Sequence, residues 1–162
     1  LTESFKPMGH DKGEGLYRRS VYTFWKRTGP APVMMALDAS KRDVCRAKRE
    51  TTATPLQALV LMNGPQFVEA ARKLGESMVR EHGDNIRSII NNMFRKLTSR
   101  EPSEREIVLM QKLHKEQLAN FQKDNKATEA FLGVGASHNE MDLDKPQVAA
   151  AGVLATALRN FD

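Results

Sequence analysis

The chain has 162 residues, of which 40% are hydrophobic and 28% charged, and this is the size and composition of one ordinary globular domain. No apolar run approaches the ~18 residues that a membrane-spanning helix needs. The single cysteine, Cys45, excludes an internal disulfide. Because the first residue is Leu1 and not Met, we expect a piece of a longer protein, whose missing signal peptide says nothing about compartment.

The net charge of +5 is concentrated in the N-terminal third. Residues 1–50 hold eleven Lys and Arg against six Asp and Glu, whereas residues 51–162 hold fourteen of each. This asymmetry indicates an anionic partner for the first third, of a class that includes nucleic acid, acidic polysaccharide, an acidic protein and another domain of the same polypeptide. A solvated basic face without any partner is the alternative.

The first third is expected to be the less regular part of the chain. Residues 1–15 are rich in Gly and Pro and show no period, which predicts a loop or tail, and 16–162 are expected to form a single helical domain. The spacing over 16–28 favours a helix over a strand. The side chains that this helix would turn inward, as core, are Tyr17, Val21, Phe24 and Trp25.

Clearer helix signals follow. Thr54-Pro55 with Gln57 predicts a helix start, and Asn63-Gly64-Pro65 predicts a stop and restart. Apolar stripes and caps predict further helices, the first of them capped by Asp84. The predicted ranges are 55–62, 65–82, 86–97, 104–122, 126–132 and 145–160, with one turn near 33–37 and a short helix near 41–47. The fold class is therefore all-α: an irregular basic third followed by a bundle of about five to six amphipathic helices.

No catalytic constellation or metal site is predicted. The four histidines are scattered, and there is no Cys-x-x-Cys-His, so no haem is expected to attach to this chain. His138, Glu140, Asp142 and Asp144 share one loop, but their spacing fits no calcium loop, which favours a solvated loop.

The best binding signal is the interleaving of aromatic and basic residues over 17–27. Both nucleic-acid and carbohydrate sites place flat aromatic faces beside cations. If the segment is a helix, however, its aromatic residues belong to the core. The candidate binding residues are Arg18, Arg19, Trp25, Lys26, Arg27, Asp38, Arg46, Arg49 and Thr54.

Two long phrases carry a family resemblance. They are residues 17–28, YRRSVYTFWKRT, and residues 54–71, TPLQALVLMNGPQFVEAA. With Leu37-Asp38-Ala39 and Cys45 between them, and LTSREPS at 97–103, they resemble the planctomycete-type domain of unknown function numbered fifteen fifty-three. Gly29 and the run 46–48 depart from its typical pattern.

The resemblance implies the C-terminal region of a much larger exported protein of planctomycetes or related bacteria, in the periplasm or at the cell surface. In such proteins the region follows another domain of unknown function and often a cytochrome-c-like domain, so any haem would lie elsewhere in the parent. No activity comes with the resemblance, and we do not expect this chain alone to be an enzyme.

Three functions are compatible with these observations. The leading hypothesis is a helical interaction module whose basic third docks on the upstream domain or on another acidic partner. The alternative is a composite polysaccharide-directed or redox enzyme site shared with the upstream domain, using Asp38, Arg46, Arg49 and Thr54. The third and least favoured is nucleic-acid binding through Arg18, Arg19, Lys26, Arg27, Lys41, Arg42, Arg46, Lys48 and Arg49.

Overall fold

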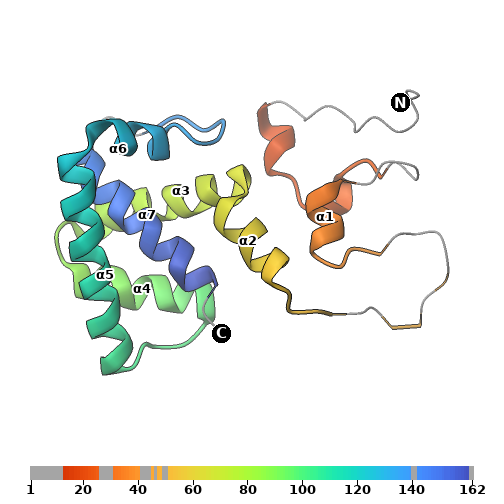
Figure 1. Cartoon of the computed structure of the whole chain (residues 1–162), viewed down its shortest axis with the longest axis horizontal. Helices are drawn as coiled ribbons and strands as arrows, with labels where there is room; N and C mark the ends of the chain where they lie inside the picture. The colour runs from red at the N-terminus through yellow and green to blue at the C-terminus, as the bar shows by residue number, and fades with distance from the viewer. Residues whose placement is uncertain are drawn as a thin grey trace. The chain divides into compact units, whose positions relative to one another are not determined.

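The computed structural model describes residues 13–25, 31–40, 45, 47–48, 51–139 and 142–160. Within these ranges the chain is all-α and contains no strand, as predicted (Figure 1). The contacts divide the chain into an N-terminal unit, Leu1–Val60, and a C-terminal unit, Leu61–Asp162. Among the described residues, no helix is long and apolar enough to cross a bilayer. The expectation that 16–162 fold as a single domain stays a prediction.

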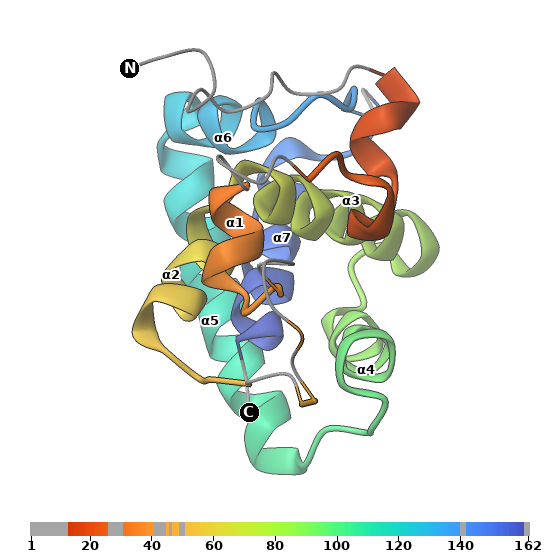
Figure 2. The same ribbon diagram turned by 90° about the vertical axis from the view of Figure 1, so that its right-hand side faces the viewer.

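The C-terminal unit is a helical bundle built around its last helix. The helices are α3 (Pro65–His82), α4 (Ile86–Thr98), α5 (Glu104–Lys123), α6 (Asn125–Leu132) and α7 (Lys145–Arg159). Helix α7 packs against each of the other four, and Figures 1 and 2 show it crossing α3 with α5 alongside. All five helices were predicted to within about two residues, because apolar stripes and terminal signals coincide in each.

The core of this unit is formed mainly by apolar side chains. Ile90, Met93 and Phe94 of α4 and Leu154 of α7 are fully inaccessible to solvent. Ala149, Ala150 and Ala151 are also inaccessible and Gly152 is buried, so this stretch of α7 presents little side-chain bulk to its neighbours. These small residues permit α3 to approach α7 closely.

The helix starts follow from local hydrogen bonds. At α5 the Ser103 hydroxyl accepts from the Glu106 amide, and the Glu106 carboxylate accepts from the Ser103 amide at 2.7 Å, which forms a capping box. The prediction that Asp84 caps α4 was wrong. Asn85 is the cap and accepts from the Ser88 amide at 3.1 Å, while Asp84 accepts a hydrogen bond from Gln147 of α7 at 2.6 Å.

The capping box at α5 makes a pH prediction. The Arg100 side-chain hydrogen bond, followed by those from Ser103, lowers the pKa of Glu106 from 4.5 to about 2. A carboxyl whose pKa is lowered by folding stabilises the fold at pH values above its pKa in the unfolded chain. This stabilisation is lost as the pH falls from 4.5 to about 2. Glu106→Gln should therefore have a lower melting temperature than wild type at neutral pH. The difference in melting temperature should shrink as the pH falls through this range. Thermal melts followed by circular dichroism check this, with the exposed Glu116→Gln as control. A gap that persists at about pH 2 would contradict it.

The N-terminal unit contains shorter elements. They are the 3-10 turns η2 (Gly13–Tyr17) and η3 (Ser20–Tyr22), the one-turn helix α1 (Pro32–Ala36), and α2 (Pro55–Asn63), whose end lies in the C-terminal unit. Helix α1 matches the predicted turn near 33–37, and α2 matches the predicted 55–62. The possible helix near 41–47 falls largely outside the described residues, as does most of the tail predicted over 1–15. Residues 13–15 of that tail belong to η2.

The predicted helix over 16–28 was wrong in its described part. The backbone there forms η2 and η3, and the supposed inward residues Tyr17, Val21 and Phe24 are 60%, 68% and 66% exposed. Two physical reasons apply. The run 21–25 consists of β-branched and aromatic residues, which are weak helix formers, and a helix this short needs tertiary packing to persist. Helical spacing of apolar residues is therefore insufficient to form an α-helix where no surface is available for them to pack against.

Candidate interaction surface

The aromatic segment, residues 13–25, exposes a dense set of large apolar side chains. Tyr17, Val21, Tyr22 and Phe24 are all at least 60% exposed, and Trp25 is half-buried. The exposed cations Arg18 and Arg19 lie between η2 and η3, in the middle of this set. Exposed aromatic residues beside arginine are typical of binding surfaces and unusual on a surface that only faces water.

The described residues of the N-terminal unit form no buried core. None of its described residues is buried, including all of those in η2, η3 and α1. This unit also carries the entire formal charge imbalance, since residues 51–60 contain no charged residue. Because the apolar side chains of this unit remain in contact with water, burying them against a partner is favourable. Its positive charge favours an acidic partner.

Asp38 organises the start of α2. Its Oδ2 accepts hydrogen bonds from the Thr52 amide (2.7 Å), the Thr52 hydroxyl (2.7 Å) and the Gln57 side-chain amide (2.9 Å). Asp38 has a φ of +57°, in the left-handed region, and Asp is among the few residues that tolerate it. The side-chain hydrogen bond from Thr52, and then the backbone one, hold the pKa of Asp38 below its ordinary value.

Thr54 belongs to the same network. The Gln57 Oε1 accepts from the Thr54 amide at 3.0 Å, and the Thr54 hydroxyl accepts from the Gln57 amide at 3.3 Å, so the predicted capping box of α2 is present. Gln57 thus links two candidate residues, Asp38 and Thr54, that are sixteen positions apart. Sequence reasoning missed Thr52, for which no periodic signal exists.

The remaining candidates are placed only in part. Arg18 and Arg19 are exposed, and Trp25, six positions after Arg19, is half-buried. Their role in binding stays a prediction. The others, Lys26, Arg27, Arg46 and Arg49, lie outside the described residues, as does Glu140 of the loop considered for a cation. In the described part of the chain no group of three His, Cys, Asp or Glu side chains is arranged to hold a metal ion.

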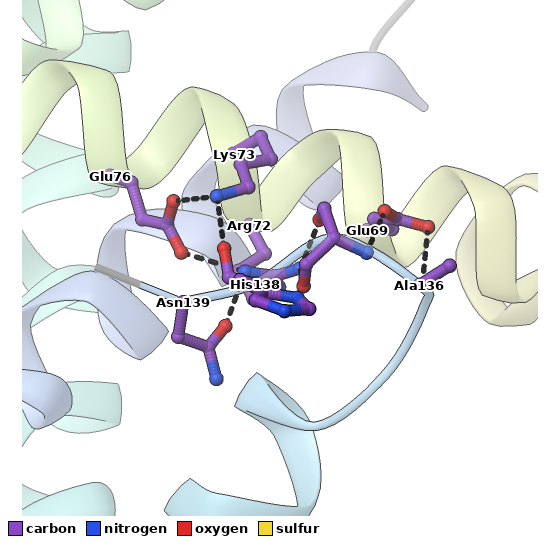
Figure 3. Close-up of polar contacts among 8 residues, drawn as sticks. Glu69, Arg72, Lys73, Glu76, Ala136, His138 and Asn139 are labelled. Atoms are coloured by element: carbon purple, nitrogen blue, oxygen red, sulfur yellow. Dashed lines mark hydrogen bonds and ion pairs between the residues drawn. The ribbon is translucent and has the colours of Figure 1, made fainter. Parts of the chain in front are cut away.

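A buried charge cluster on α3 was not predicted at all (Figure 3). Arg72 is completely inaccessible and Glu76 is 2% exposed, and their side chains are joined at 2.7 Å. Lys73 donates to the other oxygen of Glu76 at 2.6 Å and to the His138 carbonyl at 2.5 Å. The cluster therefore ties α3 to the loop between α6 and α7.

Glu69 and Arg72 hold that loop by its backbone and side chains. The Glu69 carboxylate accepts from the amides of Ala136 (3.2 Å) and Ser137 (2.8 Å). Arg72 donates to the Ser137 carbonyl at 2.9 Å and also to the side chains of Ser137 and Asn139. Gly135, at φ +98°, leaves room for Glu69, because a Cβ there would lie 2.3 Å from its Oε2. We read this cluster as an anchor for the loop, because its carboxylates and terminal guanidinium nitrogens are engaged in holding it.

A sequence signal for the cluster did exist. Glu69, Arg72 and Glu76 are spaced i, i+3 and i+7, which places them on one face of α3 next to the buried Ala71 and Val79. Charged residues on an inward face are rarely buried unless paired. A search for opposite charges on the apolar face, rather than for apolar stripes alone, would have found them.

In its described residues the chain is all-α. It has a basic N-terminal unit with no buried residue and a C-terminal unit that is a close-packed helical bundle. It belongs to the PSD1 family, proteins of unknown function (DUF1553), whose family model matches residues 2–114. The match covers the aromatic segment and extends into α5, and residues 115–162, including α7, lie beyond it. Neither the curated proteins nor the solved structures include a match to the chain.

Proposed function

We propose that this chain is a non-catalytic interaction module, which docks the exposed face of its basic N-terminal unit on an acidic surface of the domain that precedes it in a larger, extracytoplasmic parent protein. The observation that carries the proposal is the aromatic segment, where four large apolar side chains at least 60% exposed flank Arg18 and Arg19 in sequence. Tyrosine, tryptophan and arginine are the residues that dominate binding energy in protein interfaces.

Charge supports an acidic partner. The +5 of residues 1–60 raises the rate at which an anionic surface is encountered, and the neutral C-terminal unit adds nothing to it. The extracytoplasmic setting and the upstream domain come from the family resemblance carried by the phrases at 17–28 and 54–71.

The composite-enzyme alternative is less well supported. It assigns chemistry to Asp38 and Thr54, but both are engaged in the hydrogen bonds that start α2. The lowered pKa of Asp38 makes it a weak proton acceptor near neutral pH, because general bases work best with a pKa close to the working pH. These residues therefore favour a structural role.

The proposal is tested with the preceding region of the parent polypeptide, produced separately. Arg18→Glu with Arg19→Glu is expected to weaken its binding at least ~10-fold at low salt, because like charges then face each other. Arg105→Glu with Lys115→Glu, which makes the same charge change on exposed residues of α5, is the matched control and should bind like wild type. Binding is measured by biolayer interferometry.

Other outcomes would overturn the proposal. Equal weakening by both variants would indicate a general charge effect without a docking surface. A parent without a preceding domain, or no binding to that domain together with salt-sensitive affinity for single-stranded nucleic acid, would favour the nucleic-acid alternative, since exposed aromatic residues beside arginine also stack on bases.

A further inference from the structure

Helix α2 has the apolar composition of a buried helix, but none of its residues is buried. Its sequence is PLQALVLMN, with an unbroken apolar run from Ala58 to Met62. Leu56 and Leu59 are 58% and 56% exposed. Because they are three residues apart, they lie on the same face of the helix. A helix that is apolar all round is normally covered.

This exposed face belongs to the same unit as the basic charge. Leu56 and Leu59 lie within the N-terminal unit, Leu1–Val60. Gln57, which lies between them in sequence, donates a hydrogen bond to Asp38 at 2.9 Å. Asp38 in turn accepts two hydrogen bonds from Thr52. The first turn of α2 is therefore fixed against the end of α1 by side-chain hydrogen bonds, so its leucines are presented on an ordered element.

We infer that Leu56 and Leu59 form the apolar half of the docking surface, and that the partner is a folded protein domain with an apolar groove edged by carboxylates. This rests on the proposed function and narrows its partner. Sugars and nucleobases stack on aromatic faces, but aliphatic side chains gain free energy from hydrocarbon pockets, which proteins provide. The carboxylate edge follows from charge complementarity with the +5 unit.

The two halves of the surface have different kinetic roles. Exposed charges at the solvated rim of a contact mainly accelerate association and are screened by salt, whereas apolar burial slows dissociation and is little affected by moderate salt. Charge reversal at Arg18 and Arg19 should therefore act on the association rate and its salt dependence. Polar substitution at Leu56 and Leu59 should act on the dissociation rate and leave the salt dependence unchanged.

The test variant is Leu56→Gln with Leu59→Gln, because glutamine is a good helix former. Against the preceding region of the parent polypeptide, its dissociation should be at least ~10-fold faster, with the association rate within ~2-fold of wild type at both ~0.05 M and ~0.5 M salt. The matched control is Val108→Gln with Leu109→Gln on α5, whose side chains are equally exposed at 64% and 52%. Its rates should equal those of wild type.

Two further measurements keep the outcomes distinct. Leu56→Met with Leu59→Met conserves apolar volume and should retain wild-type dissociation, and the far-ultraviolet circular dichroism of all variants should coincide. If the glutamine variant dissociates like wild type while charge reversal still weakens binding, this inference fails and the proposed function stands. If neither change alters binding, both fail.

Discussion

Replacing Arg72 with methionine is expected to lower the free energy of unfolding by ~3–5 kcal/mol, because it breaks a buried ion pair and leaves the Glu76 carboxylate with Lys73 alone. Arg72 is fully inaccessible and holds Glu76 at 2.7 Å, while Glu76 itself is only 2% exposed. The loop also loses its bonds from Arg72 to Ser137 and Asn139. Urea unfolding followed by circular dichroism, with an unchanged slope, gives the difference.

A matched control separates burial from simple loss of charge. Arg87→Met removes an arginine whose side chain is 54% exposed and pairs with Glu104 at 2.5 Å, and it should cost less than about 1 kcal/mol. The double change Arg72→Met with Glu76→Leu should recover part of the loss, because a buried apolar pair needs no compensating charge. An Arg72 variant as stable as the Arg87 variant would show that the cluster is not an anchor.

The C-terminal unit was predictable because several local signals agree there. At α5, the capping box of Ser103 and Glu106 and an apolar stripe mark the same helix. Where only one signal was available the prediction failed. Asp84 and Asn85 are both good caps, and Asp84 instead accepts a hydrogen bond from Gln147, a contact distant in sequence that no local signal encodes.

The N-terminal unit was less predictable because its structure does not follow from local periodicity. Tyr17, Val21 and Phe24 have helical spacing, but none of the described residues of the unit buries them. Asp38 meets Thr52 across fourteen positions, a contact that no sequence period encodes. The aromatic and basic residues of the candidate surface were visible in the sequence, whereas their exposure could be known only from the structure, and their role in binding stays a prediction.

Gly75→Ala is expected to reduce the free energy of unfolding by a net ~1–3 kcal/mol, even though alanine is the better helix former by about 1 kcal/mol. A Cβ on Gly75 would lie 2.8 Å from the Gly152 nitrogen, 3.0 Å from the Val148 carbonyl oxygen and 3.2 Å from the Ala151 carbonyl carbon. All three atoms are backbone of α7, so relief requires α3 and α7 to separate, and the core around α7 would open with them.

The companion variant on the facing helix shows whether the backbone is the obstacle. A Cβ on Gly152 would meet the Phe131 ring, at 2.9 Å from Cε1, and the Arg72 Cα only at 3.4 Å. Because the half-buried Phe131 side chain can shift, Gly152→Ala should cost less than Gly75→Ala in the same urea titration. If Gly75→Ala is neutral or stabilising, the two helices have room to spare, and the small residues of α7 would need an explanation other than close approach.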